Sequence, residues 1–371
     1  MTVYTTIQYP QDIYTATIKN TSGSIIGVFD SFSTITISRT FNDVGTCIIE
    51  VDQSHPILDD LSLDYRIEVL SDITNVLFSG KTFIGVYRGN NITFGSDGRK
   101  LYTLYFTDLF SVLQRQIVAY TSDTANRSTW TSTLTTSIMS DIIRYNCVNG
   151  QDSGRETAIL QDILTVTISP TPSVNSIDFN CAWRNAYDVI KELLKTESSH
   201  RITFLQNGTK YDTLIAASPS IYAIRDLTER FVFDFDEGNS YNVNVDRTDT
   251  NRTTGVLVGD SNSGSARNTV YRTNSDHSGV NAFESFIDAF NTDVTSELNA
   301  IGDAEVNNNL IIKKEQFTPI FRTSLIPFRD ITEGDLVTTI FSGTKETKRV
   351  KTIIMDVSGK ERVFTMLLEE E

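Results

Sequence analysis

The sequence predicts a mainly β protein with an α+β region in its middle. Residues 1–112 consist almost wholly of short apolar–polar alternations separated by polar turns. Residues 236–371 show the same pattern. The intervening residues 113–235 carry the clearest helical pattern in the chain. At 371 residues the chain exceeds the usual size of one hydrophobic core. We therefore expect three regions, with boundaries near residues 112 and 235.

The first region is best defined by a hairpin at residues 34–51. Alternation with Thr and Ser places four side chains on one face of a strand: Ile35, Ile37, Arg39 and Phe41. Polar residues 42–45 can turn, and residues 48–51 resume the alternation. Further strands are expected at 13–18, 25–29, 66–70, 77–86 and 101–106. Six or more short strands at this spacing favour a closed barrel or a sandwich.

The middle region should combine helices with a hairpin. Short amphipathic helices are expected at 108–118 and 131–145, and the clearest helix lies at 181–195. Its apolar stripe follows helical spacing: Trp183, Ala186, Tyr187, Ile190, Leu193 and Leu194. An Asn207-Gly208 turn between two alternating runs then predicts a β-hairpin.

The last region should be a second set of strands with a helical excursion. Strands are expected at 241–245, 255–259, 336–341, 349–356 and 362–368. Residues 281–301 predict an amphipathic helix between them, with several Phe, Ile and Leu side chains on one face. Residues 64–69 and 334–339 are each followed by Phe-Ser-Gly and a further strand. This short similarity leaves a duplicated barrel an open alternative.

Composition limits the classes of function. A formal net charge of −15 disfavours binding to the outside of duplex DNA, which needs a basic surface. No apolar run is long enough for a membrane span, and no Sec signal precedes the first strand. The three cysteines are far apart and are expected to be small buried hydrophobes in a protein assembled in a reducing cytoplasm: Cys47, Cys147 and Cys181.

No constellation of side chains predicts catalysis or metal binding. The three histidines are scattered and are expected to have ordinary surface roles: His55, His200 and His277. Asp234, Asp236 and Glu237 cluster, but they suit a turn as well as a carboxylate pair, and a complete calcium loop is missing. We therefore assign no catalytic, cofactor-binding or metal-binding residue and expect no enzyme.

Four segments together resemble the tail hub (baseplate hub) family of tailed bacteriophages. They are the hairpin with Arg39, Phe41, Asp43 and Gly45, the LFSGK strand at 77–81, the AWRNAYDVIKELLK helix at 182–195 and the GDLV strand at 334–337. The resemblance implies two tube-like β-barrels that flank the α+β domain, within 1–112 and 236–371. It also implies a homotrimeric ring that joins a six-fold tail tube to a three-fold tail tip and lets DNA pass.

The same resemblance implies the partners and the location of the protein. The partners would be a distal tail protein, a tape-measure protein and tail fibre or spike proteins, with DNA only as passing cargo and no stable membrane insertion. The protein would be part of the virion tail tip, assembled in the host cytoplasm. Arg39 and Asp43 flank the hairpin turn and are candidates for an inter-subunit contact, although a solvated surface pair is an equal alternative. Alternative functions are a host-receptor or carbohydrate-binding module and a tail-associated hydrolase.

Overall fold

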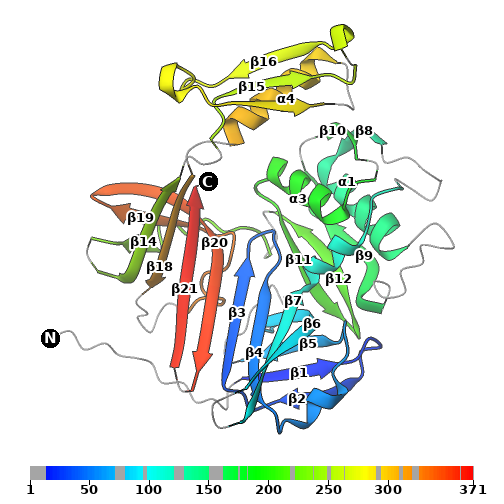
Figure 1. Ribbon diagram of the computed structural model, residues 1–371, viewed down its shortest axis with the longest axis vertical. Helices are drawn as coiled ribbons and strands as arrows, with labels where there is room; N and C mark the ends of the chain where they lie inside the picture. Colours follow the sequence, from blue (N-terminus) through cyan, green and yellow to red (C-terminus); the bar gives the residue numbers. More distant parts are fainter. Residues whose placement is uncertain are drawn as a thin grey trace. The chain divides into compact units, whose positions relative to one another are not determined.

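A computed structural model shows two compact units, residues 1–243 with 317–369 and residues 244–316 (Figure 1). The first unit contains a large sheet and a mixed α/β region, and the second contains a small sheet with one helix. The structure describes residues 14–71, 80–94, 98–120, 129–149, 162–173, 176–181, 183–217, 222–236, 238–248, 252–262, 264–289, 294–308, 312–319, 326–359 and 361–370.

The first unit is built on a 13-stranded sheet with the order β14-β18-β21-β20-β3-β4-β7-β6-β5-β1-β2. β19 pairs with β20, and β13 pairs with β19. The bounds of the N-terminal strands are β1 Thr15–Lys19, β2 Ile25–Phe29, β3 Thr34–Thr40, β4 Thr46–Asp52, β5 Arg66–Leu70, β6 Phe83–Phe94 and β7 Lys100–Asp108. Those of the C-terminal strands are β13 Val232–Asp234, β14 Ser240–Thr248, β18 Ile312–Pro319, β19 Leu336–Phe341, β20 Thr344–Ser358 and β21 Glu361–Glu370.

Alternation gives this sheet one apolar face. In β3 and β4 every second side chain is buried, and the others are partly exposed or exposed. The buried set enters a core shared with β5, β7 and β20, where each fully buried aliphatic side chain contributes about 1.5–3 kcal/mol. The hairpin predicted at 34–51 is confirmed by the antiparallel register of Ile35 with Ile49 and of Ile37 with Cys47.

The C-terminal strands do not form a sheet of their own, and that expectation is wrong. β20 pairs with β3 along seven residues, from Thr352 opposite Thr40 to Ser358 opposite Thr34. In Figure 1 the orange-red strand β20 lies between red β21 and blue β3. Strands from the two ends of the chain therefore share one sheet and one core. Two separate closed barrels are not confirmed.

The middle region has a core of its own, formed by apolar residues of its helices and strands with Ile84 and Val86 of β6. β8 pairs with β10, and β9 lies parallel to β12 in the sheet β11-β12-β9. The bounds are β8 Thr129–Leu134, α1 Thr135–Ile142, β9 Leu164–Pro170, β10 Ser176–Asn180, α3 Ala186–Thr196, β11 Arg201–Asn207 and β12 Lys210–Ala216. The short helical segments are η2 Pro56–Asp60, η4 Leu109–Arg115 and η5 Ile143–Val148.

Three expectations for the middle region need correction. The helix predicted from 181 begins at Ala186, because Asn185 caps it by accepting the amide of Tyr187. Trp183 precedes the helix with a φ of 64° and is 67% exposed, so it is not part of the buried stripe. The helix predicted from 131 begins at Thr135, because 129–134 form β8.

The second unit is a three-stranded sheet with the order β16-β15-β17, packed with helix α4. Its bounds are β15 Gly255–Gly259, η6 Gly264–Ala266, β16 Thr269–Thr273, η7 Gly279–Asn281, β17 Glu284–Asp288 and α4 Thr295–Asn308. The helix predicted at 281–301 is wrong over 284–288, because those residues pair parallel to β15. β15 itself belongs to this small sheet and not to the main sheet, where a second barrel had been expected to include it.

Candidate functional site

The hairpin turn between β3 and β4 is the centre of a polar junction in the first unit. Asn42 has a φ of 49°, and its amide bonds two backbone groups of the middle region: its Nδ2 donates to the carbonyl of His200 (2.9 Å), and its Oδ1 accepts the amide of Ile202 (3.1 Å). Positive φ is tolerated better by Asn than by most residues. The turn is therefore held to the start of β11 as part of the fold.

Asp43 extends the same contact to helix α3. Its carboxylate accepts hydrogen bonds from the Tyr187 hydroxyl, from the Lys191 ammonium group and from the amide of Val44 (2.8 Å). Burial by itself would raise the pKa of Asp43, but the hydrogen bonds outweigh it and lower the pKa. Asp43 is therefore ionised in the neutral range and pairs with Lys191.

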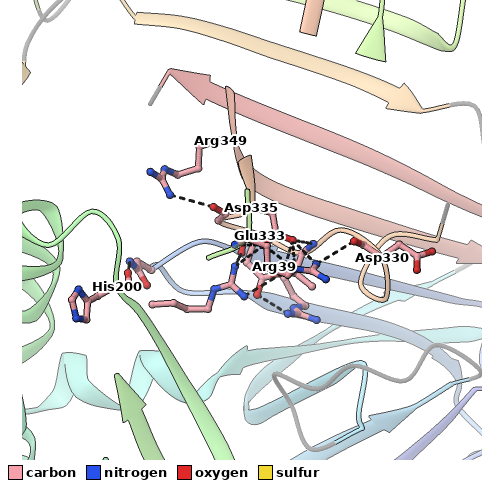
Figure 2. A network of polar contacts seen from close by, with 11 residues as sticks. Arg39, His200, Asp330, Glu333, Asp335 and Arg349 are labelled. Atoms are coloured by element: carbon pink, nitrogen blue, oxygen red, sulfur yellow. Dashed lines mark hydrogen bonds and ion pairs between the residues drawn. The ribbon is translucent and has the colours of Figure 1, made fainter. Parts of the chain in front are cut away.

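Arg39 lies on the apolar face of β3 and is only 2% exposed. Its guanidinium donates to Glu333 Oε1 (2.5 Å) and stacks on the Phe328 ring, 4.8 Å from the ring centre. Figure 2 shows this pair in the middle of a larger network. Burial lowers the pKa of Arg39, and the attraction of Glu333 offsets part of that effect. Arg39 thus ties β3 to the loop that precedes β19.

Arg201 and Asp335 complete the network. Arg201 donates to the carbonyl of Glu333 and to Thr332 Oγ1 (3.2 Å), and it lies 3.6 Å from Asp335 Oδ1. Asp335 is fully buried, and its Oδ2 accepts from Arg225 Nη2 at 2.5 Å. Such a buried network is strongly destabilised when one partner is removed. It joins β3, β11 and the 330–335 loop, which are far apart in sequence.

His200 lies at the same junction. It is 3% exposed, with its ring at hydrogen-bond distance from the carbonyl of Thr171 (3.2 Å), so the predicted surface role is wrong. His277 is also engaged, because its ring lies 3.0 Å from Thr254 Oγ1 and 2.9 Å from the Tyr271 hydroxyl. Both histidine rings are therefore engaged in contacts within their own unit of the fold.

The junction encloses a small cavity lined by the hairpin turn, Asp108, Phe110, residues 201–204 and Glu333. Asp108 Oδ2 accepts the amide of Gly45 (2.7 Å), and its Oδ1 accepts the amide of Phe110 (3.0 Å). Burial raises the pKa of Asp108 to about 7, although these backbone hydrogen bonds act in the opposite direction. Asp108 is partly buried by surface area, and its two carboxylate oxygens join the hairpin turn to the start of η4.

Sequence reasoning found only part of this site. Arg39 and Asp43 were singled out, and the structure gives both of them partners within the chain; their inter-subunit contact stays a prediction. The sequence carried one usable signal, because Arg39 shares a strand face with Ile35 and Ile37 and therefore needs a buried partner. Its partner Glu333 lies 294 residues away, and nothing in the sequence indicated the pairing.

The opposite face of the same strands is polar. Side chains of β20, β3, β4 and β7 form what we call the polar sheet face: Thr352, Ile354, Asp356, Ser358, Thr34, Thr36, Ser38, Thr40, Thr46, Ile48, Glu50, Asp52, Thr103, Tyr105 and Thr107. Thr36 donates to Asp356 (2.6 Å), and Thr34 donates to Glu50 (2.9 Å). No Lys or Arg belongs to this set, but Arg88 donates to Thr107 Oγ1 (3.0 Å) and the charge of Arg99 acts on Asp52, so the face is rich in hydroxyl groups and carries a few carboxylates.

Other expected features concern metal ligands, a turn and the cysteines in the part of the chain that the structure describes. Within it, no group of His, Cys, Asp and Glu is arranged to hold a metal ion, and no helix is long and apolar enough to cross a membrane. Asp234 Oδ1 accepts the amide of Asp236 (3.0 Å), as in a turn, whereas Glu237 lies outside the described residues. The three cysteines are buried as predicted.

The known proteins that resemble this chain include tail proteins of prophages and bacteria. The model of the Siphovirus ReqiPepy6 Gp37-like protein family matches residues 15–366. The fold is similar to the 43 kDa tail protein of prophage MuSo2 from Shewanella oneidensis (10% identity, 96% of this chain and 98% of that one, TM-score 0.63). It is also similar to a tail protein from Neisseria meningitidis MC58 (10% identity, 98% and 97%, TM-score 0.61). No curated protein matches the sequence.

Proposed function

The chain belongs to the Siphovirus ReqiPepy6 Gp37-like family, and on that premise we propose that it is a structural tail hub protein of a tailed phage. Three copies would form a ring that joins the six-fold tail tube to the three-fold tail tip, inside the virion. Its neighbours would be a distal tail protein, a tape-measure protein and fibre or spike proteins. The proposed role is non-enzymatic. The polar sheet face is the observation that carries the proposal.

A channel for DNA needs a wall that does not retain phosphate. The polar sheet face consists mainly of hydroxyl and carboxylate side chains, with Arg88 in contact with Thr107 and the charge of Arg99 acting on Asp52, and such a predominantly uncharged and acidic surface attracts phosphate weakly. The opposite face of these strands is the apolar core. We infer that the polar sheet face lines the channel.

Two tube-like lobes per chain are proposed from the order of the main sheet. One lobe would be β3 to β2 within residues 1–112, and the other β20, β21, β18, β14 and β19 within 236–371, with the middle region of 113–235 beside them. Three chains then supply six lobes, which matches a six-fold tube. The end strand β2 exposes Ile25 (65%) and Val28 (42%), and pairing with a neighbouring copy would cover such an edge.

The purified protein is expected to form a trimer. A ring that joins sheet edges should bury well over the roughly 1,000 Å² that marks a specific interface. Light scattering coupled to size exclusion should therefore give three times the mass of one chain. A Val28→Lys variant, which places a charge on the open edge, should shift the population towards monomer. A wild-type protein that is monomeric at every concentration, or a ring of six copies, contradicts the model.

Positive charge on the polar sheet face should interfere with passage of DNA. Thr36→Lys combined with Thr103→Lys adds two ammonium groups to the proposed channel wall in each of three subunits, where they attract phosphate. We expect virions that assemble normally but eject DNA several-fold more slowly, with recovery at high salt. The control is Ser22→Lys, an exposed position in the β1–β2 turn. Equal ejection rates in all three proteins would place the channel elsewhere.

One observation favours the host-binding alternative for the second unit. Leu257 of β15 is flanked in register by Tyr271 and Phe286, and all three are exposed on one side of the small sheet (39%, 46% and 53%). Aromatic side chains of this kind are common in recognition surfaces. The second unit is therefore the part of the chain in which a receptor- or carbohydrate-binding role would reside.

A further inference from the structure

The second unit exposes one face of its three-stranded sheet (Figure 1). Leu257, Tyr271 and Phe286 lie in one row across β15, β16 and β17, because both Tyr271 and Phe286 are in register with Leu257. All three side chains are exposed, whereas Val256 and Val258 point to the other side of β15 and are buried in the core of this unit. We call Leu257, Tyr271 and Phe286 the apolar row.

Two glycines of β15 allow neighbouring side chains to lie over this face of the sheet. Gly255 and Gly259 are two residues before and after Leu257, so they face the same side of the strand. A Cβ built on Gly255 would lie 2.5 Å from the Tyr271 hydroxyl oxygen, and one built on Gly259 would overlap Arg267 Nε. The side chains of Tyr271 and Arg267 therefore extend over the two glycines, which leaves a shallow, open surface beside Leu257.

Polar contacts hold the Tyr271 ring in this position. Its hydroxyl donates to Glu284 of β17 and lies 2.9 Å from His277 Nε2. The other nitrogen of the His277 ring lies 3.0 Å from Thr254 Oγ1. The ring is thus oriented before any ligand arrives, and a side chain that is already ordered costs less entropy when it binds.

The charged groups beside the apolar row are already engaged with one another. Arg267 lies over the Phe286 ring, 5.2 Å from its centre, and pairs with Asp288. Glu284 lies 4.0 Å from His277 Nε2 in addition to its bond from the Tyr271 hydroxyl. A phosphate-bearing partner would have to compete with Asp288 for the Arg267 guanidinium. The charge distribution therefore favours a neutral partner with hydroxyl groups.

Sugar rings have the chemistry that complements this surface. The C–H face of a pyranose ring stacks on an aromatic ring, and its hydroxyl groups can bond carboxylates and imidazoles beside that ring. Tyr271 and Phe286 are on strands separated by β15, so their backbones are about 10 Å apart. This separation is close to the length of two rings in an extended β-1,4-linked chain. Alternate sugars can then stack on Tyr271 and Phe286, with the intervening sugar over Leu257.

We propose that the apolar row of the second unit binds an extended β-1,4-linked polysaccharide, with Tyr271 and Phe286 as the stacking residues. This inference rests on the host-binding alternative proposed above for the second unit and gives it a ligand class. It is separate from the hub role, which the mass of the purified protein tests.

Calorimetric titration of the full chain with soluble hexasaccharides tests the site. Cellohexaose and chitohexaose are both β-1,4-linked, and at least one of them should bind; a difference between them shows whether the acetamido group is recognised. Maltohexaose has α-1,4 links that curve the chain, so it can stack on only one of the two rings. It should bind about tenfold more weakly, as expected for the loss of one stacking contact.

Variants show whether the two rings are the binding groups. Tyr271→Ala and Phe286→Ala should each weaken binding by about threefold to tenfold, whereas Phe286→Tyr keeps a ring and should stay within about twofold of the wild type. Phe94→Ala is the matched control, because Phe94 is an exposed Phe of β6 in the first unit, and it should leave the affinity unchanged. Urea denaturation of each variant shows that it is folded.

Three titration results overturn the proposal: no binding of either β-1,4-linked hexasaccharide at millimolar concentration, equal binding of maltohexaose, or unchanged affinity in either alanine variant. Light scattering adds a fourth. If Phe286→Ala lowers the mass of the assembled protein, the apolar row is a contact between copies and not a sugar site. A wild-type monomer that still binds the hexasaccharide contradicts the trimeric hub alone and leaves the sugar site standing.

Discussion

Replacement of Arg39 by alanine is expected to destabilise the first unit by about 3–5 kcal/mol. The substitution leaves the Glu333 carboxylate buried without its guanidinium and empties the space over the Phe328 ring. Both effects act in the folded state, where Arg39 is 2% exposed. Urea denaturation of the purified protein, followed by circular dichroism, measures the loss as a lower midpoint.

Two further variants show whether the buried pair is the cause. Arg184→Ala removes an exposed partner of Glu192, with side chains 40% and 46% exposed, and should cost no more than about 1 kcal/mol. Arg39→Met combined with Glu333→Leu replaces the pair by apolar groups and should recover much of the lost stability. If Arg39→Ala proves as mild as Arg184→Ala, the junction does not depend on this pair.

Local patterns in the sequence predicted most strands of the main sheet, although not β13 and β18, and they did not predict which strands pair. Ile35, Ile37 and Arg39 alternate with hydroxyl side chains, and this period-two pattern predicted β3 and its hairpin. The partner of β3 on its other edge is β20, more than 300 residues further along the chain. Period-two alternation shows which side chains share a face of a strand, but it does not show which strand pairs with which. The sequence therefore suggested separate N-terminal and C-terminal sheets, whereas these strands form one main sheet.

Two helix predictions were wrong, at residue 183 and over part of 281–301, and both errors have similar physical causes. Trp183 fits the helical spacing, but its positive φ and the Asn185 cap begin the helix three residues later. Phe286 and Ile287 fit a helical face as well as a strand, and the parallel pairing with β15 decides for the strand. For the site, Arg39 was predicted to lie at a subunit contact or in a solvated pair; its place on an apolar strand face is the signal that could have indicated a buried partner, whereas Glu333 and Asp108 could be identified only from the fold.

Gly334→Ala is expected to be among the most damaging single substitutions in the chain. Gly334 has a φ of +91°, and a Cβ placed there would lie 2.6 Å from Phe41 Cε2 and 2.8 Å from Arg201 Nη2. The left-handed backbone costs an L-residue about 1–2 kcal/mol, and the clash adds about 1–3 kcal/mol. The sum, about 2–5 kcal/mol, would be seen as a lower midpoint of urea denaturation.

Gly343→Ala separates strain from packing. Gly343 lies in the turn between β19 and β20 with a φ of +73°, and nothing lies within 4 Å of a Cβ built there. The free energy of unfolding of this variant should fall only by the cost of the left-handed backbone, about 1–2 kcal/mol. The difference between the two glycines then measures how tightly the junction packs Phe41 and Arg201 against the 330–335 loop. Equal losses would mean that Phe41 and Arg201 move aside readily, and the junction would then be looser than its buried ion pairs imply.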